Sequence, residues 1–200
     1  MTADLWAPER ELRARGARHV AGVDEAGRGP LAGPVVAAAV VLPAGFSHPG
    51  IRDSKRLSAA QRERLVPVIT GVAVAWAVAE SPEAEIDSVN ILQATLRAME
   101  RALAALAVAP DYLLVDGPTF PKVLVPGEGV VRGDRRVACI AAASILAKVH
   151  RDRLMREHHE RWPVYGFDRH KGYGTAAHLR ALAAHGPCPI HRRSFRGVQA

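Results

Sequence analysis

Four acidic residues stand where a predicted strand or an apolar run gives way to a turn. They are Asp24, Glu25, Asp116 and Asp134, and a glycine lies within three residues of each. Carboxylates at strand ends point into the crevices where open sheets place ligands, although the same residue types are also common turn formers and helix caps. Most other acidic residues fall in amphipathic helical segments or near the start of the chain. As a set, these four therefore indicate a candidate site.

Carboxylates that converge repel one another, and protons bind to some of them unless a cation neutralises the group. Oxygen ligands alone favour Mg²⁺ or Mn²⁺ over zinc, and two such ions about 3.5 to 4 Å apart are the known arrangement for phosphodiester displacement. One geometric difficulty remains, because adjacent residues of a regular strand face opposite ways. Asp24 and Glu25 can reach one site only if the chain bends, which the exit at residues 26–27 allows.

The overall charge points to a polyanionic partner. The 200 residues include 27 Lys and Arg against 20 Asp and Glu, a net charge of +7, and nucleic acid is the first candidate for such a chain. The longest purely apolar run, residues 35–42, is far shorter than the roughly 20 residues that cross a bilayer. The first 18 residues lack the apolar core of a secretory signal. We therefore expect a cytoplasmic monomer with no membrane partner, and basic charge with an acidic metal cluster indicates a nuclease or a polymerase.

The apolar pattern predicts the elements that must position the acids. Residues 19–24 and 35–42 have the character of two strands joined by a turn-rich connection, and residues 71–79 repeat it, which predicts an antiparallel meander. Residues 112–115 predict a further buried strand. Helical spacing covers residues 58–69, with Ser58 as the N-cap, and also residues 81–103, 138–159 and 175–184.

These elements predict an α/β fold in which helices flank a mixed central sheet. We expect one domain over residues 19–200, including a C-terminal helical portion, and a tail over residues 1–18. Cys139 and Cys188 lack the spacing of a zinc site or a disulfide framework, so two reduced thiols are expected. His158, His159 and His178 have no partners at ligand spacing and are expected to be solvated helix residues.

A series of blocks, in order along the chain, closely resembles the bacterial ribonuclease HII family. The opening block is GVDEAGRGPLAGPV at residues 22–35. The later blocks are DSKRLS at 53–58, NILQAT at 90–95, VDG at 115–117, GD at 133–134, IAAASILAKV at 140–149, RD at 151–152, HKGYGT at 170–175 and HRRSF at 191–195. The resemblance covers nearly the whole chain and implies a ribonuclease H-like fold. Arg28 within a Gly-Arg-Gly run favours this family over ribonuclease HIII.

The resemblance implies an endonuclease that cleaves the RNA strand of RNA/DNA hybrids. It also implies cleavage on the 5′ side of single ribonucleotides embedded in duplex DNA, leaving 3′-hydroxyl and 5′-phosphate ends. By motif matching, Asp24, Glu25, Asp116 and Asp134 would be the catalytic carboxylates. They would bind two divalent ions, Mg²⁺ or Mn²⁺, during catalysis.

Motif matching also implies a set of residues that recognise the ribose. Gly27, Arg28 and Gly29 resemble the family's ribose sensor, in which glycine lets backbone groups approach the 2′-hydroxyl; a simple tight turn is the other interpretation, and the two are compatible. Tyr173 resembles the tyrosine that hydrogen-bonds that hydroxyl. On residue type alone, a tyrosine is more often part of the core.

Four further residues lie in matched blocks and are candidate phosphate contacts: Lys55, Ser144, Lys148 and Lys171. Ser144 and Lys148 are four residues apart, so they share one face of a helix. A solvated helix face with a local hydroxyl hydrogen bond is the alternative. Arginine makes up 23 of the 27 basic residues, so this chain uses arginine wherever either cation would serve. The few lysines therefore indicate positions that need a compact ammonium group.

Some features depart from the pattern or leave alternatives open. Asp168 and residues 196–198 differ from the expected family residues, and His170 has either a structural or a substrate role. The sequence ends at Ala200 without an apolar-aromatic tail, so we expect no attachment to a sliding clamp through the C-terminus. The rival interpretations are another phosphodiesterase on the same fold, such as an exonuclease or junction resolvase, and a hybrid-binding module whose carboxylates are structural.

Overall fold

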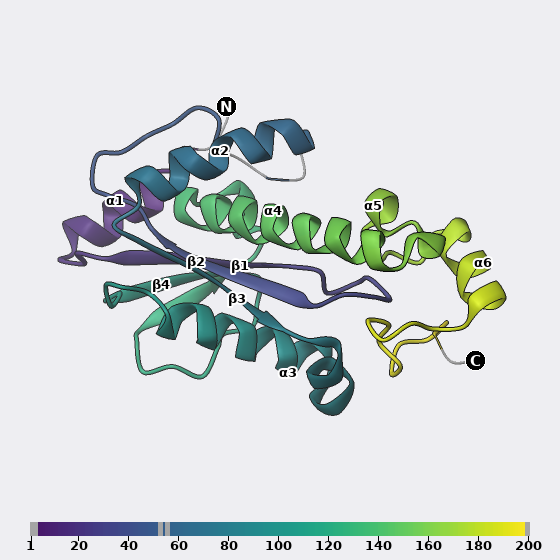
Figure 1. Ribbon diagram of the computed structural model, residues 1–200. Helices are drawn as coiled ribbons and strands as arrows, with labels where there is room; N and C mark the ends of the chain where they lie inside the picture. Colours follow the sequence, from purple (N-terminus) through teal and green to yellow (C-terminus); the bar gives the residue numbers. More distant parts are fainter. Residues whose placement is uncertain (1–3, 52–53, 55–56, 199–200) are drawn as a thin grey trace.

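The computed structural model describes residues 4–51, 54 and 57–198. In this part of the chain, five strands form one mixed sheet in the order β3-β2-β1-β4-β5 (Figure 1). β1, β2 and β3 pair antiparallel, whereas β4 is parallel to β1 and β5 is parallel to β4. The strands are β1 (Val20–Ala26), β2 (Val35–Val41), β3 (Ala75–Ser81), β4 (Tyr112–Asp116) and β5 (Gly127–Val130). The predicted α/β class and the antiparallel meander are therefore confirmed.

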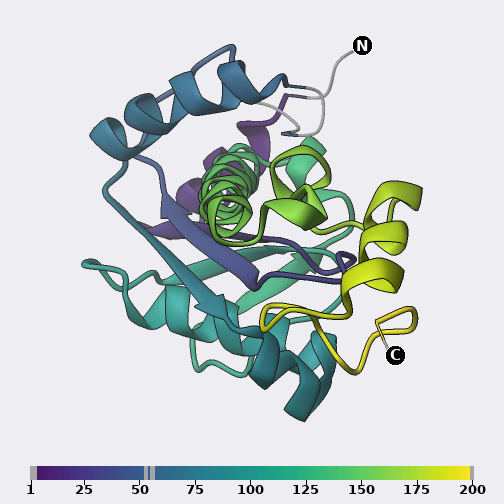
Figure 2. The same ribbon diagram turned by 45° about the vertical axis from the view of Figure 1, so that its right-hand side comes forward.

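Helices cover both faces of the sheet, with α4 along one face and α3 along the other (Figures 1 and 2). The helices are α1 (Ala7–Ala14), α2 (Ala59–Val72), α3 (Glu83–Ala104), α4 (Ala138–Arg161), α5 (Phe167–His170) and α6 (Ala176–His185). The 3₁₀ turn η2 (Gly133–Arg135) precedes α4, and the 3₁₀ turn η3 (Pro163–Tyr165) lies between α4 and α5. Over the residues described, no helix is both long and apolar enough to span a membrane.

The start of α2 confirms the predicted cap. The hydroxyl of Ser58 accepts a hydrogen bond from the backbone N–H of Gln61, and the side-chain oxygen of Gln61 accepts one from the N–H of Ser58. This reciprocal pair satisfies two donors that a helix otherwise leaves open. The other end differs from the prediction, because α2 continues to Val72 and β3 begins only at Ala75.

The two faces of β2 explain why residues 35–42 form an uninterrupted apolar run. Every residue of β2 is buried, and the side chains alternate between two cores. Val36, Ala38 and Val40 pack in the cluster that contains α4, whereas Ala37 and Ala39 pack in the cluster that contains α3. A strand covered on both faces has no solvated side, so it does not alternate between apolar and polar residues.

A single glycine lets α4 approach the centre of the sheet. A Cβ atom built at Gly22 would lie 2.2 Å from the carbonyl carbon of Cys139, at the start of α4, so any side chain at this position would push the helix away. Because β1 carries Asp24 two residues further along the same face, the close approach brings the side chains of α4 next to that carboxylate.

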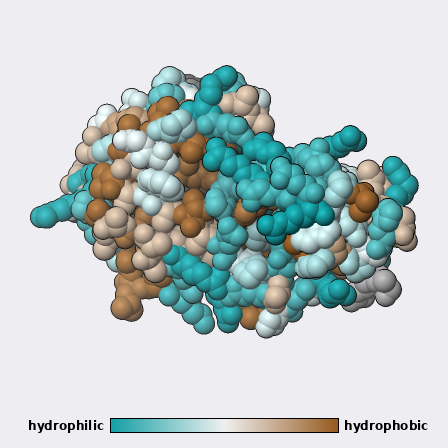
Figure 3. Space-filling model, viewed as in Figure 1, coloured by the Kyte–Doolittle hydropathy of each residue, from teal (hydrophilic) through white to brown (hydrophobic). Residues whose placement is uncertain are grey.

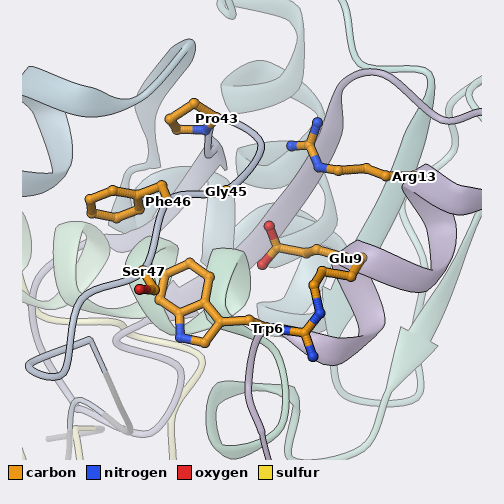
Figure 4. A pocket seen from close by; sticks show the side chains of 8 residues that line it. Trp6, Glu9, Arg13, Pro43, Gly45, Phe46 and Ser47 are labelled. Atoms are coloured by element: carbon orange, nitrogen blue, oxygen red, sulfur yellow. The ribbon is translucent and has the colours of Figure 1, made fainter.

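The predicted N-terminal tail is wrong for the described residues, because residues 7–14 form α1 and α1 packs on the core. Glu9 is 5% exposed, and its carboxylate accepts a hydrogen bond of 2.7 Å from the backbone N–H of Cys139. The backbone N–H of Ala138 donates to Leu5 O. Figure 4 shows Glu9 of α1 across a cavity from the 43–47 loop. The segment is anchored because it supplies acceptors to the first turn of α4, whose N–H groups have no partner within the helix.

Candidate active site

A cavity of about 240 Å³ opens where β1 ends. It collects residues that are far apart in the sequence, from β1 to the segment between α5 and α6. The lining residues are Asp24, Glu25, Ala26, Gly27, Arg28, Gly29, Ser54, Arg62, Ser144, Lys148, Arg151 and Tyr173. Most of the predicted site residues therefore share one cavity.

Asp24 is the buried acid of this site. It is 4% exposed, and one of its carboxylate oxygens accepts the backbone N–H of Glu25 at 2.7 Å. Burial raises the pKa of Asp24 well above its usual value, and the negative charges of Glu25 and Asp116 raise it further. A hydrogen bond with the Ser144 hydroxyl acts in the opposite direction. The charged form of Asp24 is thus destabilised by its surroundings.

Asp116 lies beside Asp24 because β1 and β4 run parallel. The last pair of their ladder is Val23 with Val115, so the next residue of each strand is an aspartate at the carboxyl end of the sheet. The Asp116 carboxylate accepts a hydrogen bond of 2.6 Å from the backbone N–H of Gly133. This bond ties η2 to the end of β4 and places Asp134, which is 2% exposed, one residue from the contact.

Glu25 follows Asp24 on β1 without a break in the strand. The pairing of β1 with β2 continues through Glu25 and Ala26, so β1 does not bend between the two acids, and the chain turns only at Gly27. The Glu25 side chain is 15% exposed and lies 3.5 Å from the guanidinium of Arg28. The bend expected at residues 26–27 comes after both acids, yet Asp24 and Glu25 both line the cavity, and the negative charge of Glu25 acts on Asp24.

The donor set suits a hard cation, although the side chains do not form a closed ligand shell. Among the described residues, no group of three or more His, Cys, Asp or Glu side chains is arranged to hold a metal ion. Asp24 and its two acidic neighbours nevertheless lie close enough for their charges to act on one another. Each of these like charges destabilises the ionised form of its neighbours unless a cation neutralises the group, and carboxylate oxygens are the ligands of Mg²⁺ and Mn²⁺.

Two buried arginines hold the connection between β1 and β2. Arg192 is fully buried and donates four hydrogen bonds of 2.5 to 3.0 Å to the carbonyls of Gly27, Arg28 and Gly33. Arg151 is 1% exposed and donates at 3.0 Å to the carbonyls of Ala32, Pro34 and Lys171. Burial lowers the pKa of Arg151 to about 10 and that of Arg192 to about 9, so both stay charged at neutral pH. Arg192 thus holds the backbone of the predicted ribose sensor, and Arg151 holds the later part of the same connection.

Gly27 is required by both conformation and space. Its φ of +99° lies in the region that favours glycine, and a Cβ atom there would lie 2.0 Å from Nε of Arg151. The tight-turn interpretation of the Gly-Arg-Gly run therefore holds at this residue. Arg151 fills the space that a side chain would need, and Gly27 itself lines the cavity, which is compatible with ribose recognition.

Tyr173 lies at the mouth of the cavity rather than in the core. Its side chain is 49% exposed, and a Cβ atom built at Gly29 would lie 3.5 Å from a ring carbon of Tyr173. The tyrosine ring therefore lies beside Gly29 of the predicted sensor, at a distance that leaves room for no more than a Cβ atom. The alternative of a buried core tyrosine is wrong.

The candidate phosphate contacts differ in their surroundings. Ser144 and Lys148 both line the cavity, as their shared helix face predicts. Ser144 is 5% exposed and lies 2.8 Å from the hydroxyl of Ser54, and Lys148 donates to Asp152 at 2.7 Å. Lys171 donates instead to the carbonyl of Asp168 and does not line the cavity, and Lys55 lies outside the described residues.

The structure adds residues that the sequence did not single out: Ser54, Arg62, Arg151 and Arg192. Arg62 donates to the carbonyls of Ser54 and Leu57 and lies 3.8 Å from Asp152. Arg151, Arg192 and Ser54 all fall in the matched sequence blocks, which was a usable signal. Their roles were hidden because a buried arginine that contacts backbone carbonyls has no partner visible in the sequence.

The histidine prediction is wrong at one position. His158 and His159 are only partly buried, but His178 has no exposed surface and lies 3.0 Å from His191, which is 2% exposed. His170 bonds to the carbonyl of Tyr165 and to the N–H of Gly172, so it has a structural role. Cys139 and Cys188 are free, as expected, and both are buried.

The comparisons with known proteins agree with this arrangement. A family model described as Ribonuclease HII matches residues 21–198. The ribonuclease HII of Geobacter metallireducens is 56% identical over 195 residues, which cover 98% of this chain and 92% of that protein. The ribonuclease H2 from Pyrococcus horikoshii OT3 has a TM-score of 0.77 at 27% identity, covering 90% of this chain and 95% of that one.

A more distant structure supports the fold alone. Bst-RNase HIII in complex with Mn²⁺ has a TM-score of 0.68 at 18% identity, covering 92% of this chain and 68% of that one. The ribonuclease H-like fold and the family resemblance expected from the sequence blocks are confirmed. The chain belongs to the ribonuclease HII family, and it is a hydrolytic endoribonuclease.

Proposed function

We propose that this chain cuts the RNA strand of RNA/DNA hybrids and also cuts on the 5′ side of a single ribonucleotide in duplex DNA. The products would carry 3′-hydroxyl and 5′-phosphate ends. Family membership supports the first activity. One arrangement supports the second: the buried acid Asp24, the 27–29 backbone and the Tyr173 ring line the same cavity. Such a cavity can couple hydrolysis to the 2′-hydroxyl, the group that distinguishes RNA from DNA.

We assign the binding of two divalent ions, Mg²⁺ or Mn²⁺, to Asp24, Glu25, Asp116 and Asp134, which are also the proposed catalytic residues. The mutual repulsion that acts on Asp24 supports this assignment, because a cation would relieve it. When bound, the ions would supply an activated water and stabilise the leaving 3′ oxygen. The chain itself contributes the parallel ends of β1 and β4, which hold two of these carboxylates side by side.

The remaining site residues would hold the substrate. The backbone at Gly27, Arg28 and Gly29 would contact the ribose, and the phenol of Tyr173 would donate or accept at the 2′-hydroxyl. Arg151 and Arg192 would keep this backbone rigid, which supports recognition because a loop that is already ordered loses less entropy on binding.

Phosphate contacts are proposed for the candidate basic residues and the serine of α4. Ser144 and Lys148 would act inside the cavity. Lys55 and Lys171 would contact flanking phosphates of the nucleic-acid strand. Hydrophilic side chains cover the part of the surface over α4 and α5 (Figure 3), and the net charge of +7 favours a polyanion throughout.

The test uses an end-labelled DNA duplex with one internal ribonucleotide. We expect one cut immediately 5′ of that ribonucleotide in Mg²⁺ or Mn²⁺. EDTA and the Asp24→Asn variant should both abolish the cut. The matched control is the same duplex with deoxyribose at that position, which should stay intact.

Three other outcomes would overturn the proposal. Digestion from the ends of the duplex would indicate an exonuclease, and selective cutting of four-way junctions would indicate a resolvase. Stoichiometric binding without turnover in either metal would indicate a hybrid-binding module whose carboxylates are structural.

A further inference from the structure

A pair of buried histidines lies directly behind Tyr173, outside the cavity. His178 belongs to α6, and His191 lies in the C-terminal segment that forms a bridge with Ala32. The two Nε2 atoms are 3.0 Å apart. The rings of Tyr165, Phe167 and His170 surround the pair, with centroids 4.5 to 6.5 Å from His178 or His191. The pair is thus enclosed by aromatic rings on the described part of the chain.

The hydrogen-bond partners determine where the protons lie. Nδ1 of His178 is 2.9 Å from the carbonyl oxygen of Tyr173. An oxygen of that kind can only accept, so Nδ1 carries the proton and Nε2 of neutral His178 carries a lone pair. Nε2 of His191 must then donate to His178. Nδ1 of His191 is left to accept, and it faces two donors of Cys188, the backbone N–H at 3.0 Å and the thiol at 3.1 Å, whereas the Cys188 carbonyl oxygen is further away at 3.3 Å.

The result is a chain of donors with one direction, from Cys188 through His191 and His178 to the Tyr173 carbonyl. Adding a proton at either acceptor nitrogen would place two N–H groups against each other. In agreement, burial lowers the pKa of His178, and burial together with His178 lowers that of His191 to about 4. Both imidazoles are neutral at physiological pH.

We propose that His178 and His191 are positioning residues, which fix the backbone of Tyr173 and thereby aim its phenol ring at the cavity. The inference rests on the proposed function, in which Tyr173 reads the ribose 2′-hydroxyl. The Tyr173 carbonyl accepts two hydrogen bonds, from the His178 ring and from the N–H of Thr175 at 2.8 Å. Two donors therefore hold the backbone of Tyr173 at its carbonyl group.

A third histidine, His170, holds the residue that precedes Tyr173. Nε2 of His170 donates to the carbonyl of Tyr165 at 2.7 Å, which leaves Nδ1 to accept the N–H of Gly172 at 3.2 Å. The His170 ring stacks on the His178 ring at 4.5 Å and 15°. One imidazole thus holds the residue before Tyr173 and the stacked imidazole holds Tyr173 itself.

This support matters because the phenol ring is only loosely held by packing. Tyr173 lies in the short segment between α5 and α6, and half of its side chain is exposed. Gly29 lies beside the ring but has no side chain to hold it, since the 3.5 Å approach would be that of a Cβ atom that glycine lacks. A reacting group misplaced by about 1 Å can cost about 100-fold in rate, so precision has to come from the backbone.

The test is a double-mutant cycle on the labelled duplex with one internal ribonucleotide. His178→Gln places its amide where Nε2 lies and removes the donor to Tyr173. We expect kcat/KM to fall about 10- to 100-fold. His178→Asn places its amide near Nδ1, keeps that donor and should recover most of the loss. His185→Asn, an exposed position on the same helix, is the matched control and should leave kcat/KM unchanged.

The cycle separates positioning from a general structural defect. In a Tyr173→Ala background, His178→Gln should cause little further loss, because residues that act through one group are not additive. An equal loss in both backgrounds, or a His178→Asn variant as poor as His178→Gln, would overturn the proposal. If the wild-type protein leaves the duplex uncut, the proposed function itself fails.

The wild-type protein offers a measurement that needs no variant. Long-range proton–nitrogen NMR correlations of the ¹⁵N-labelled imidazoles report which ring nitrogen is protonated. At pH 7 we expect a neutral Nδ1–H form for His178 and a neutral Nε2–H form for His191. The opposite tautomer or a charged ring at either residue would contradict the inference.

Discussion

Burial and like charge act on the Asp24 carboxylate in the same direction. Both raise its pKa, because each disfavours the ionised form. An acid in such a position lowers the stability of the folded chain whenever it is ionised and no cation is present. The ionised form of Asp24 therefore lowers stability, whereas the proposed metal binding requires it. Such a conflict between stability and activity is common at functional sites.

The Asp24→Asn substitution should separate these demands. The amide keeps the shape but removes the charge, so we expect the free energy of unfolding to rise by about 1 to 2 kcal/mol without divalent ions. Cleavage should be lost. Addition of Mg²⁺ or Mn²⁺ should raise the Tm of the wild type more than that of the variant, because only binding to the folded state stabilises it. An equal Tm shift in both proteins, measured by calorimetry, would contradict the assignment of Asp24 as a metal ligand.

The guanidinium of Arg192 does what an ammonium cannot. It reaches the carbonyls of Gly27, Arg28 and Gly33 at once, and its planar fork is suited to several acceptors in one plane. In the Arg192→Lys variant the charge remains, but some of these buried carbonyls lose their donor. We expect a loss of about 2 to 4 kcal/mol in urea unfolding at pH 7.

The neighbouring residue provides the control for that experiment. Arg193 is exposed, and its backbone N–H rather than its side chain bonds to Asp87. Arg193→Lys should therefore change the free energy of unfolding by less than about 0.5 kcal/mol. If the two variants proved equally stable, the fork of Arg192 would not hold the loop.

At the scale of elements, α1 acts as a cap for α4. The first N–H groups of a helix lack internal partners, and α1 provides the Glu9 carboxylate for one of them. Glu9→Ala should lower the free energy of unfolding by about 1 kcal/mol, the usual cost of losing a cap. Glu9→Gln keeps an acceptor and should cost less. Glu11→Ala, at an exposed position of the same helix, is the control, and a matching loss there would rule out capping by Glu9.

Periodicity predicted the elements that have a long apolar face, and missed those that depend on distant contacts. α2, α4 and the meander follow from the residues within each segment. α1 was missed because its anchor is a contact between Glu9 and Cys139, far away in the sequence. β5, which reads GEGV, is short and largely exposed. The kink of α3 at Asn90 (φ 69°, ψ 163°) has no counterpart in the spacing of the apolar residues.

At the scale of the whole molecule, the sheet order explains how the acids meet. β1 and β4 are neighbours although two strands and two helices separate them in the chain, so Asp24 and Asp116 end adjacent parallel strands. The sequence places each acid at the end of a predicted strand, but it does not show which strands are neighbours in the sheet. The cavity residues were assigned from the motif blocks, whereas the arginines that pin the loop required the packed structure.

The stability of the whole chain in acid should depend on the buried imidazole of His191. His191 is buried, and its pKa is about 4 in the folded state against a usual 6.5. The unfolded chain therefore binds this proton at a higher pH than the folded chain does. The stabilising contribution of the neutral imidazole is complete above pH 6.5 and is lost as the pH falls towards 4, by at most about 3 kcal/mol.

Comparison with a variant isolates this contribution from the other charges of the basic chain. We expect the difference in unfolding free energy between the wild type and His191→Gln to shrink by about 1 to 3 kcal/mol from pH 7 to pH 4, since glutamine does not titrate. Urea unfolding at a series of pH values measures it, and the same series with the exposed His185→Gln is the control. A difference that stays constant across this range would mean that His191 does not depend on being neutral, and the directed chain behind Tyr173 would lose its physical basis.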